Sequence, residues 1–261
     1  MHHAYQSALV TGASSGIGER LARRLAADGC DLVILARRTG RLEALAAELS
    51  GAHQVRVEVL TADLTSPAGL DAAQARLSDP DRPIELLVNN AGFGSSGSFA
   101  DLPVGNAQAQ VGLNVTALVR LTHAALPGML RRGHGGVLNV SSVAGFVPSP
   151  GAAVYGATKA FITSFSESLA AEVKGRGVHV TALCPGFTRT DGPGRSGAGP
   201  AALAWLDADQ VARAGLEAVA AGRVLSVPGA QYKSVVSLSR VVPRAVVRAA
   251  AAAVRRNSVG W

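Results

Sequence analysis

An apolar strand that runs directly into a glycine-rich turn and then into a helix constrains this chain most. The run Ala8 to Val10 is followed by Thr11-Gly-Ala-Ser-Ser-Gly-Ile-Gly18. Gly12 permits a tight turn out of the strand, Gly16 lets the backbone approach a pyrophosphate, and Gly18 allows close packing of helix on sheet. The spacing is G-x-x-x-G-x-G, and a glycine pattern alone is weak evidence. The preceding strand and the following amphipathic helix predict a dinucleotide-binding turn.

Seven short apolar runs predict the strands of the fold. Most of them are continuous rather than alternating, which is typical of parallel strands covered on both faces. The segments between them have helical period. The pattern predicts a doubly wound α/β fold, with a seven-stranded, mostly parallel sheet and helices on both faces. The predicted strands are Ala8 to Val10, Leu32 to Ala36, Val55 to Leu60, Ile84 to Val88, Val137 to Val140, Val178 to Leu183, and Val224 to Val227.

Helix signals agree with this layout. Ser66 before Pro67 predicts an N-cap, and Asp207 with Gln210 resembles a capping box whose helix ends near Gly222. Two long helices are expected over residues 106–132 and 152–174.

Bulk properties favour one domain over residues 1–261, since 48% of the residues are hydrophobic and no linker or repeat interrupts the chain. We expect a substrate flap at about 188–206 and a C-terminal helical extension at about 230–258. The N-terminus lacks the features of a secretory signal, and no run of about 18 apolar residues occurs. The sequence therefore predicts a cytoplasmic protein, in which Cys30 and Cys184 are buried thiols rather than a disulfide.

The net charge of +7 and the pI near 10.2 raise the question of nucleic-acid binding. Arginines are spread over several predicted helices, only 4% of residues are aromatic, and no nucleic-acid motif is present. We therefore expect no nucleic-acid partner. No metal site is expected either.

The end of the second strand indicates which dinucleotide is bound. A site selective for NAD places an acid there, whereas this chain has Ala36-Arg37-Arg38. Guanidinium groups bind a 2′-phosphate through paired, charge-assisted hydrogen bonds. The sequence predicts NADPH over NADH, with Arg37 as the main contact and Ser15 or Arg38 assisting. The alternative is a pair of arginines on a solvated strand end.

Tyr155 and Lys159 stand one helical turn apart, thirteen residues after Ser142. Reduction of a ketone needs a proton donor within hydrogen-bond reach of the developing alkoxide. A tyrosine with an ordinary pKa of about 10 is a poor base near neutrality, and a cation at i+4 stabilises its phenolate. An ordinary amphipathic helix pair is the alternative interpretation.

Five motifs in order resemble the short-chain dehydrogenase/reductase family over roughly residues 5 to 190. They are the segment from Thr11 to Gly18, Asn89-Asn-Ala-Gly92, Ser142, Tyr155-Gly-Ala-Thr-Lys159, and Pro185-Gly186. The resemblance implies a Rossmann fold, an NADP(H) cofactor and a Tyr-x-x-x-Lys mechanism.

The resemblance also implies roles for the catalytic residues. Tyr155 donates or accepts the proton, and Ser142 polarises the substrate oxygen, with Ser141 as the competing candidate. Lys159 also binds the nicotinamide ribose. Asn114 matches the family position that joins a water-linked proton relay through the lysine, and an asparagine on the helix surface is the alternative.

Cofactor contacts follow from the same resemblance. Asp63 resembles the acid that binds the adenine amino group beside the backbone of Leu64, although an aspartate capping a turn fits nearly as well. Thr190 ranks before Thr188 as a contact of the nicotinamide carboxamide. The full set of expected cofactor contacts is Gly12, Ser14, Ser15, Gly16, Ile17, Gly18, Arg37, Arg38, Asp63, Leu64, Asn90, Ala91, Gly92, Tyr155, Lys159, Pro185, Gly186, Thr188 and Thr190.

The expected substrate is a small carbonyl or alcohol compound, an apolar ketone or a 3-oxoacyl compound. Phe93, Phe146, Phe187 and Trp205 are candidate pocket residues, with plain core packing as the alternative. Two other functions remain: an NADPH-binding regulatory or scaffold protein without turnover, and an epimerase or dehydratase that uses the same Tyr/Lys logic.

The resemblance implies a homodimer or homotetramer that uses the two long helices as contact surfaces. Near the C-terminus, Arg240, Arg244 and Arg248 stand at i+4 steps, so they are expected to share one helix face. That face could contact a membrane surface or another subunit. Solvated arginines beside a packed apolar face are the simpler interpretation.

Overall fold

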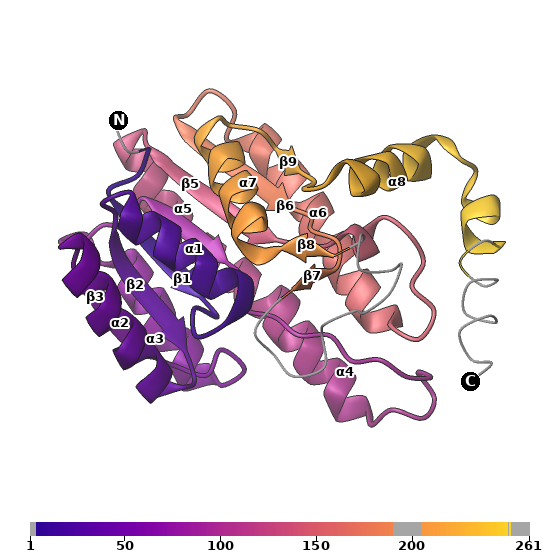
Figure 1. Cartoon of the computed structure of the whole chain (residues 1–261), viewed down its shortest axis with the longest axis horizontal. Helices are drawn as coiled ribbons and strands as arrows, with labels where there is room; N and C mark the ends of the chain where they lie inside the picture. Colours follow the sequence, from indigo (N-terminus) through magenta and orange to yellow (C-terminus); the bar gives the residue numbers. More distant parts are fainter. Residues whose placement is uncertain (1–3, 190–204, 250, 252–261) are drawn as a thin grey trace.

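The computed structural model describes residues 4–189, 205–249 and 251. Its main sheet has the order β3-β2-β1-β4-β5-β6-β9, and every strand pair in it is parallel (Figure 1). This confirms the predicted doubly wound α/β fold and all seven strands. The strands are β1 (Ser7–Thr11), β2 (Asp31–Ala36), β3 (Val57–Thr61), β4 (Leu86–Asn89), β5 (Gly135–Val140), β6 (Val178–Leu183) and β9 (Leu225–Ser226).

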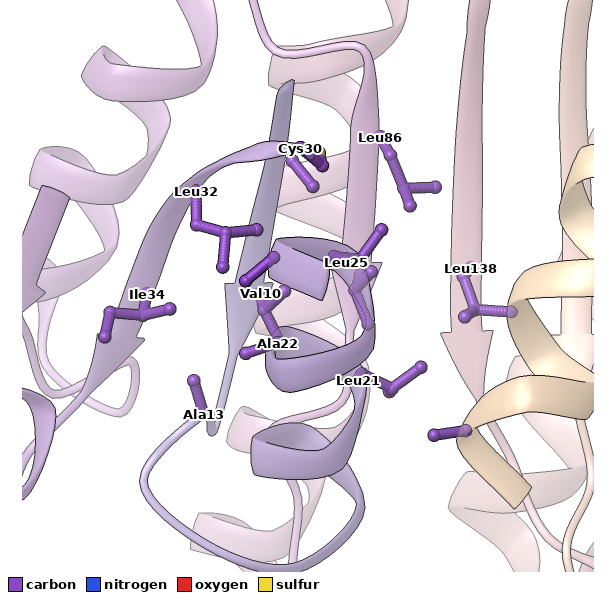
Figure 2. Close-up of a cluster of buried hydrophobic side chains, with 14 of the residues drawn as sticks. Val10, Ala13, Leu21, Ala22, Leu25, Cys30, Leu32, Ile34, Leu86 and Leu138 are labelled. Atoms are coloured by element: carbon purple, nitrogen blue, oxygen red, sulfur yellow. The ribbon is translucent and has the colours of Figure 1, made fainter. Parts of the chain in front are cut away.

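Helices cover both faces of this sheet. The buried residues form two clusters, because alternate side chains along each strand point to opposite faces. On one face the strands pack against α1 (Gly16–Ala27), α2 (Thr39–His53) and α7 (Ala208–Ala220). Figure 2 shows part of that cluster, in which Leu21, Ala22 and Leu25 of α1 lie against the strands. On the other face the strands pack against α3 (Pro67–Ser78), α5 (Leu118–Arg132) and α6 (Ala153–Glu172).

The strand order places a switch point between β1 and β4. The chain winds outward from β1 through β2 to β3, then crosses back to β4 and winds in the other direction. Loops that leave the carboxyl ends of β1 and β4 therefore diverge, and ligands of doubly wound sheets bind in the crevice between such loops.

The predicted long helices are present, but the first is not a uniform α-helix. It consists of α4 (Val104–Val111), a π-helical segment η1 (Gly112–Ala117) and α5. The second is α6, close to the predicted 152–174. Both predicted N-caps are confirmed, since Ser66 accepts from Gly69 N at 3.1 Å and Asp207 accepts from Gln210 N at 3.1 Å.

A buried chain of polar side chains crosses the sheet beneath the carboxyl edge. Asn89 Nδ2 donates to Thr122 Oγ1 at 3.0 Å and to Asn139 Oδ1 at 2.9 Å. Asn139 Nδ2 in turn donates to Ser166 Oγ at 2.9 Å. Because each bond is fully buried, the chain fixes α5 and α6 in register on β4 and β5.

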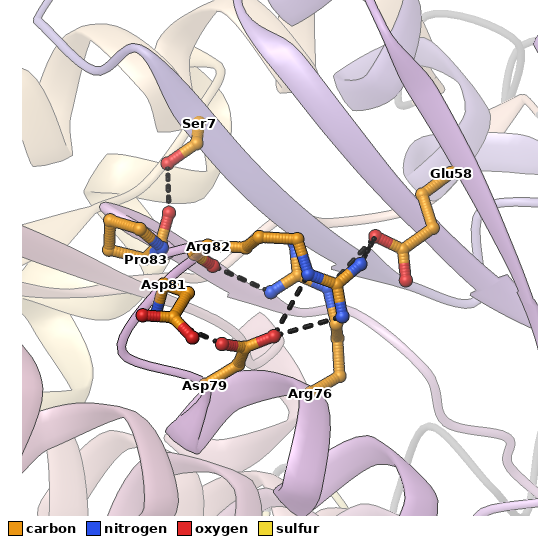
Figure 3. A network of polar contacts seen from close by, with 7 residues as sticks. All are labelled: Ser7, Glu58, Arg76, Asp79, Asp81, Arg82 and Pro83. Carbon is orange, nitrogen blue, oxygen red and sulfur yellow. Dashed lines mark hydrogen bonds and ion pairs between the residues drawn. The ribbon is translucent and has the colours of Figure 1, made fainter.

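A separate polar network lies away from the carboxyl edge and secures the outer strand β3 (Figure 3). Arg76 of α3 donates to Glu58 of β3 at 2.9 Å, and Arg82 joins the same carboxylate at 3.3 Å. Ser7 at the start of β1 donates to the Pro83 carbonyl at 2.7 Å. These contacts tie the loop before β4 to the sheet without using any candidate site residue.

The expected flap lies between two short paired strands, β7 (Thr188–Arg189) and β8 (Leu206–Asp207). Most of the flap, residues 190–204, falls outside the described residues, and Thr190 falls outside with it. Trp205 is described and packs on Phe187, with the ring centroids 5.4 Å apart.

The C-terminal extension begins with α8 (Ala230–Val241), which is followed by a separate helical segment over residues 244–249. Val242 between them is extended, with ψ 135°, because proline disfavours the helical conformation of the residue before it. The prediction that Arg240, Arg244 and Arg248 share one helix face is therefore wrong. Arg240 lies on α8 and the other two lie beyond the break.

Within the described part of the chain, no helix is long and apolar enough to cross a membrane. Cys30 and Cys184 are both buried, unpaired thiols, as expected. The described residues contain no cluster of three or more side chains suited to a metal ion.

Asn139→Leu tests the buried polar chain. The substitution keeps the approximate shape but leaves Asn89 and Ser166 each without one partner, so we expect a loss of about 2–4 kcal/mol in the free energy of unfolding. Urea unfolding measures it. The control is Asn106→Leu on the exposed surface of α4, which should change stability by less than about 0.5 kcal/mol. Equal effects of the two substitutions would contradict the role assigned to the chain.

Candidate active site

The glycine turn after β1 has the backbone geometry that its sequence predicts. Gly12 and Gly16 have φ of 67° and 61°, in the left-handed region that favours glycine. A β-carbon at Gly18 would collide with the carbonyl oxygen of Gly12, so only glycine lets α1 come this close to the turn. Ser15 at the N-cap is extended and makes no side-chain bond to the first turn of the helix. That end of α1 therefore presents backbone amides and the positive end of the helix dipole.

Asn90 holds the glycine turn from the neighbouring loop. Its Nδ2 donates to the Thr11 carbonyl at 2.8 Å. The Thr11 hydroxyl accepts from Asn90 N at 3.0 Å and from Ala91 N at 2.9 Å. The side chain of Asn90 thus braces the turn, and the two loops of the switch point form one rigid unit.

The two arginines after β2 differ in their contacts. Arg38 folds over the glycine turn and donates to the Ser14 hydroxyl and carbonyl, each at 3.0 Å. Arg37 is exposed to solvent at the same edge. Its charge contributes to a lowered pKa at Asp63, after two larger contributions from hydrogen bonds donated by Thr65.

Asp63 caps its own turn, the alternative that the sequence left open. Its Oδ1 accepts from Thr65 N at 2.9 Å and from Thr65 Oγ1 at 2.7 Å. This geometry fixes the carboxylate just after β3, next to Leu64, which is buried. An adenine contact by Asp63 stays a prediction.

Tyr155 and Lys159 lie one turn apart on α6. Lys159 is only 5% exposed, and its Nζ donates to the carbonyl of Val140, the last residue of β5, at 2.7 Å. The ammonium lies 5.7 Å from the centroid of the Tyr155 ring. Burial lowers the pKa of Lys159 to about 8, because desolvation penalises its charged form. The lysine is therefore a desolvated cation beside a phenol.

The two serines after β5 have different surroundings. Ser141 Oγ donates to the Lys159 carbonyl at 2.7 Å. It also lies 2.8 Å from Thr163 Oγ1, in a hydrogen bond whose direction either hydroxyl can supply, so Ser141 holds α6 in place. Ser142 Oγ accepts from Ala144 N at 3.1 Å and has only a long contact, 3.4 Å, with the Pro185 carbonyl as acceptor. The Ser142 hydroxyl is thus better placed than that of Ser141 to donate to another oxygen.

Asn114 lies in the π-helical segment η1 and is 1% exposed, which excludes the alternative of a surface asparagine. Its Oδ1 accepts from Phe93 N at 3.1 Å, and its Nδ2 donates to the Phe93 carbonyl at 2.9 Å and to Thr158 Oγ1 at 3.1 Å. Gly92 lies between Asn114 and Lys159, since a β-carbon there would stand 2.8 Å from Asn114 Oδ1 and 3.7 Å from Lys159 Nζ. The π turn thus brings the amide to the lysine side of the site.

Two contact residues escaped the sequence analysis. A β-carbon at Gly94 would stand 2.9 Å from the Tyr155 ring, so this glycine lets the loop after β4 lie on the phenol. The ring of Tyr232 on α8 lies against Gly186, and its hydroxyl accepts from Phe187 N at 3.0 Å. Gly94 was visible as the second glycine of Gly92-Phe-Gly94. Nothing local in the sequence connects Tyr232 with a loop 45 residues earlier.

Aromatic residues and the loop after β6 lie next to this centre. Pro185 and Gly186 follow β6, and Thr188 Oγ1 donates to the Gly186 carbonyl at 3.0 Å. Phe187 is 66% exposed and Phe93 is 38% exposed, so neither is a core residue. Phe146 lies under the Arg240 guanidinium, 5.7 Å from its ring centroid, and therefore packs toward α8.

The residues present fit a dinucleotide along this edge. Gly12 and Gly16 hold the turn in left-handed conformations, Gly18 lets α1 pack against the turn, and α1 offers its amino end to a phosphate there. Arg37 and Arg38 stand at the end of β2, where such ligands place the adenosine ribose. The Tyr155 and Lys159 pair stands beyond the switch point, next to the end of β5.

A protein-family model described as short chain dehydrogenase matches residues 6–199. The chain belongs to the short-chain dehydrogenase family. Sulfoacetaldehyde reductase of Chromohalobacter salexigens is 41% identical over 184 residues, covering 70% of this chain and 72% of the relative. Serine 3-dehydrogenase of Rhizobium radiobacter is 41% identical over 185 residues, covering 70% of this chain and 72% of that protein.

Solved structures agree with this short-chain dehydrogenase assignment. The bulky-bulky ketone specific alcohol dehydrogenase of Comamonas testosteroni superposes with a TM-score of 0.80 at 34% identity, covering 91% of this chain and 92% of that one. A short-chain dehydrogenase of Sphingobium yanoikuyae in complex with NADPH also has a TM-score of 0.80, at 38% identity, covering 92% and 97%. This short-chain dehydrogenase is therefore an oxidoreductase of alcohol and carbonyl groups with a nicotinamide cofactor.

Burial of Lys159 predicts a pH dependence of stability. Between pH 8 and its ordinary pKa of 10.5, the unfolded chain holds a proton on this lysine and the folded chain does not. The free energy of unfolding of the protein without cofactor should therefore rise with pH across this window, by about 3 kcal/mol in total from this group. Lys159→Met should lack that rise, which urea unfolding at a series of pH values measures as the difference between the two proteins. A difference that is independent of pH would contradict the shifted pKa.

Proposed function

We propose that this protein is an NADPH-dependent carbonyl reductase and secondary-alcohol dehydrogenase, acting on an apolar ketone or a 3-oxoacyl compound. The observation that carries the proposal is the buried ammonium of Lys159, tied to the end of β5 and 5.7 Å from the Tyr155 ring. Catalytic roles for Tyr155, Lys159, Ser142 and Asn114 belong to the same proposal.

The proton chemistry follows from these residues. In reduction, the Tyr155 hydroxyl gives its proton to the carbonyl oxygen, and the Ser142 hydroxyl donates a hydrogen bond to the same oxygen. The Lys159 ammonium stabilises the phenolate that remains, because an opposite charge nearby favours the ionised form. In oxidation the phenolate takes the proton back. The bound nicotinamide supplies or accepts the hydride.

Asn114 positions the loop beside Lys159 and Tyr155 in this proposal. Its amide is anchored on both polar atoms of the Phe93 backbone, so it fixes the loop from Gly92 to Gly94 against the lysine and the phenol. Proton return from solvent passes along the Lys159 side of the site in this proposal.

The preference for NADPH rests on charge. Arg37 is exposed and Arg38 is braced on Ser14, and no carboxylate occupies the end of β2 to repel a phosphate. The NADPH complex of the Sphingobium yanoikuyae relative supports the same choice. Gly12, Ser14, Ser15, Gly16, Ile17 and Gly18 would hold the pyrophosphate, and Pro185, Gly186 and Thr188 would line the nicotinamide side.

An apolar substrate is supported by the exposed rings beside the site. The Phe187 ring packs against Trp205. Phe93 directly follows Gly92 in the loop after β4. A relative of similar fold is named for its specificity toward bulky-bulky ketones. We propose that these three rings contact the substrate.

Further proposals concern organisation. One seven-stranded sheet runs from β3 at one edge to β9 at the other, which supports a single domain. The stacked pair Phe161 and Phe165 on α6, with Phe161 41% exposed, supports a homodimer or homotetramer through the long helices.

Arg37→Ala tests the cofactor preference. Loss of a charge-assisted contact with the 2′-phosphate should weaken NADPH binding about 10–100-fold and leave NADH binding unchanged. Titration of cofactor fluorescence gives both dissociation constants. Arg41→Ala, an exposed arginine one turn into α2, is the matched control and should change neither. Tighter binding of NADH by the unaltered protein would refute the preference.

Tyr155→Phe tests the reaction. It removes the proton donor and keeps the ring, so kcat on a panel of carbonyl compounds should fall about 10²–10⁴-fold while NADPH still binds. Ser142→Ala should reduce kcat and Ser141→Ala should mainly reduce stability. Net consumption of NADPH supports a reductase. Product without net consumption would indicate an epimerase or dehydratase, and binding without turnover would indicate a scaffold protein.

A further inference from the structure

The net positive charge of this protein arises from its C-terminal segment. Residues 218–261 contain seven Lys and Arg and no Asp or Glu. These seven account for the whole formal net charge of +7, because the other 217 residues carry 18 Lys and Arg against 18 Asp and Glu. Residues 1–217 therefore have a formal net charge of zero, and residues 218–261 carry the whole excess of positive charge.

Apolar side chains on the same segment face solvent. Val235, Leu238 and Val241 recur at every third position of α8 and are 45%, 61% and 78% exposed. The opposite face of α8 is the one that packs on the protein, through Tyr232 and Val236, both of which are buried. Figure 1 shows α8 projecting beyond the edge of the sheet next to β9.

Basic residues border this apolar face. Lys233, Arg244 and Arg248 are exposed, and Arg240 is half exposed although it pairs with Glu167 at 3.1 Å. The segment after Pro243 repeats the arrangement, since Val246 is 56% exposed between Arg244 and Arg248. An outward apolar face with a cationic border is the pattern of helices that lie in the interface of a membrane.

From these observations we propose that α8 and residues 244–249 dock on the surface of an anionic lipid bilayer. The cations contact lipid phosphates, and the Val and Leu side chains enter the boundary of the acyl region. Attraction of the cations to lipid phosphates and burial of the apolar side chains act together, because stable peripheral binding requires two such contributions. This inference is independent of the reaction proposed above.

Two other occupants fit the face less well. A second copy in a two-fold dimer would bring the same cationic patch against itself, which opposes association. A nucleic acid would match the charge but would leave the exposed Val and Leu side chains without a partner.

The test is co-sedimentation of the full-length protein with two kinds of vesicle. One is phosphatidylcholine alone and the other is an equal mixture of phosphatidylcholine and phosphatidylglycerol. We expect binding to the anionic vesicles only, weakening as salt rises. Because each cation near such a surface is worth about fivefold in affinity, Arg244→Ala/Arg248→Ala should bind about 25-fold more weakly. The matched control Arg131→Ala/Arg213→Ala, exposed arginines elsewhere, should bind as the unaltered protein does.

The apolar face has its own variant. Leu238→Ser/Val241→Ser should weaken binding at least about tenfold without changing its salt dependence, whereas the control Val224→Ser should not. Thermal unfolding verifies that each variant is folded. The proposal is overturned if the protein does not sediment with anionic vesicles or if the control variants weaken binding as much as the test variants. Tighter binding to duplex DNA at the same salt would also overturn it. So would a change in oligomeric state of the Leu238→Ser/Val241→Ser variant without an effect on vesicle binding.

Discussion

The bond from Lys159 Nζ to the carbonyl of Val140 fixes the candidate site to the fold. It joins the first half of α6 to the last residue of a central strand, and it is buried. Removing a lysine from water is costly unless the charge is hydrogen-bonded, so this carbonyl determines where the ammonium rests. The phenol one turn earlier is placed by the same contact. Any shift of α6 along β5 would separate the cation from the oxygen that holds it.

The surroundings of this bond prevent such a shift. The chain of Asn89, Asn139 and Ser166 links the two central strands to α6, and Ser141 adds a bond to the carbonyl of Lys159 itself. A shift of α6 along the strands would break these buried hydrogen bonds, which water cannot readily replace. The apolar clusters on both faces supply adhesion, whereas these hydrogen bonds determine the register. The placement of the site therefore depends on hydrogen bonds that also contribute to stability.

Much of this architecture could be predicted from the sequence. Continuous apolar runs gave all seven main strands, the glycine turn was expected directly after the first strand, and the Tyr155–Lys159 pair was expected on the second long helix, because these features depend on local backbone geometry. Contacts between distant segments could not be predicted in this way. The π turn around Asn114 and the packing of Tyr232 on Gly186 are produced by tertiary packing. The expected common face of Arg240, Arg244 and Arg248 failed because the restriction imposed by Pro243 on Val242 outweighed the i+4 spacing.

A late residue supports one part of the candidate site, and this has a consequence for biosynthesis. The glycine turn and its bracing loop are made from the first 92 residues, whereas the loop at Gly186 and Phe187 leans on Tyr232. On a translating ribosome the residues of the glycine turn and its brace emerge first, and the loop after β6 emerges later. The loop after β6 lacks its contact with Tyr232 until α8 has left the exit tunnel. A nascent chain therefore holds every residue of its glycine turn well before it holds the residue that supports the loop after β6.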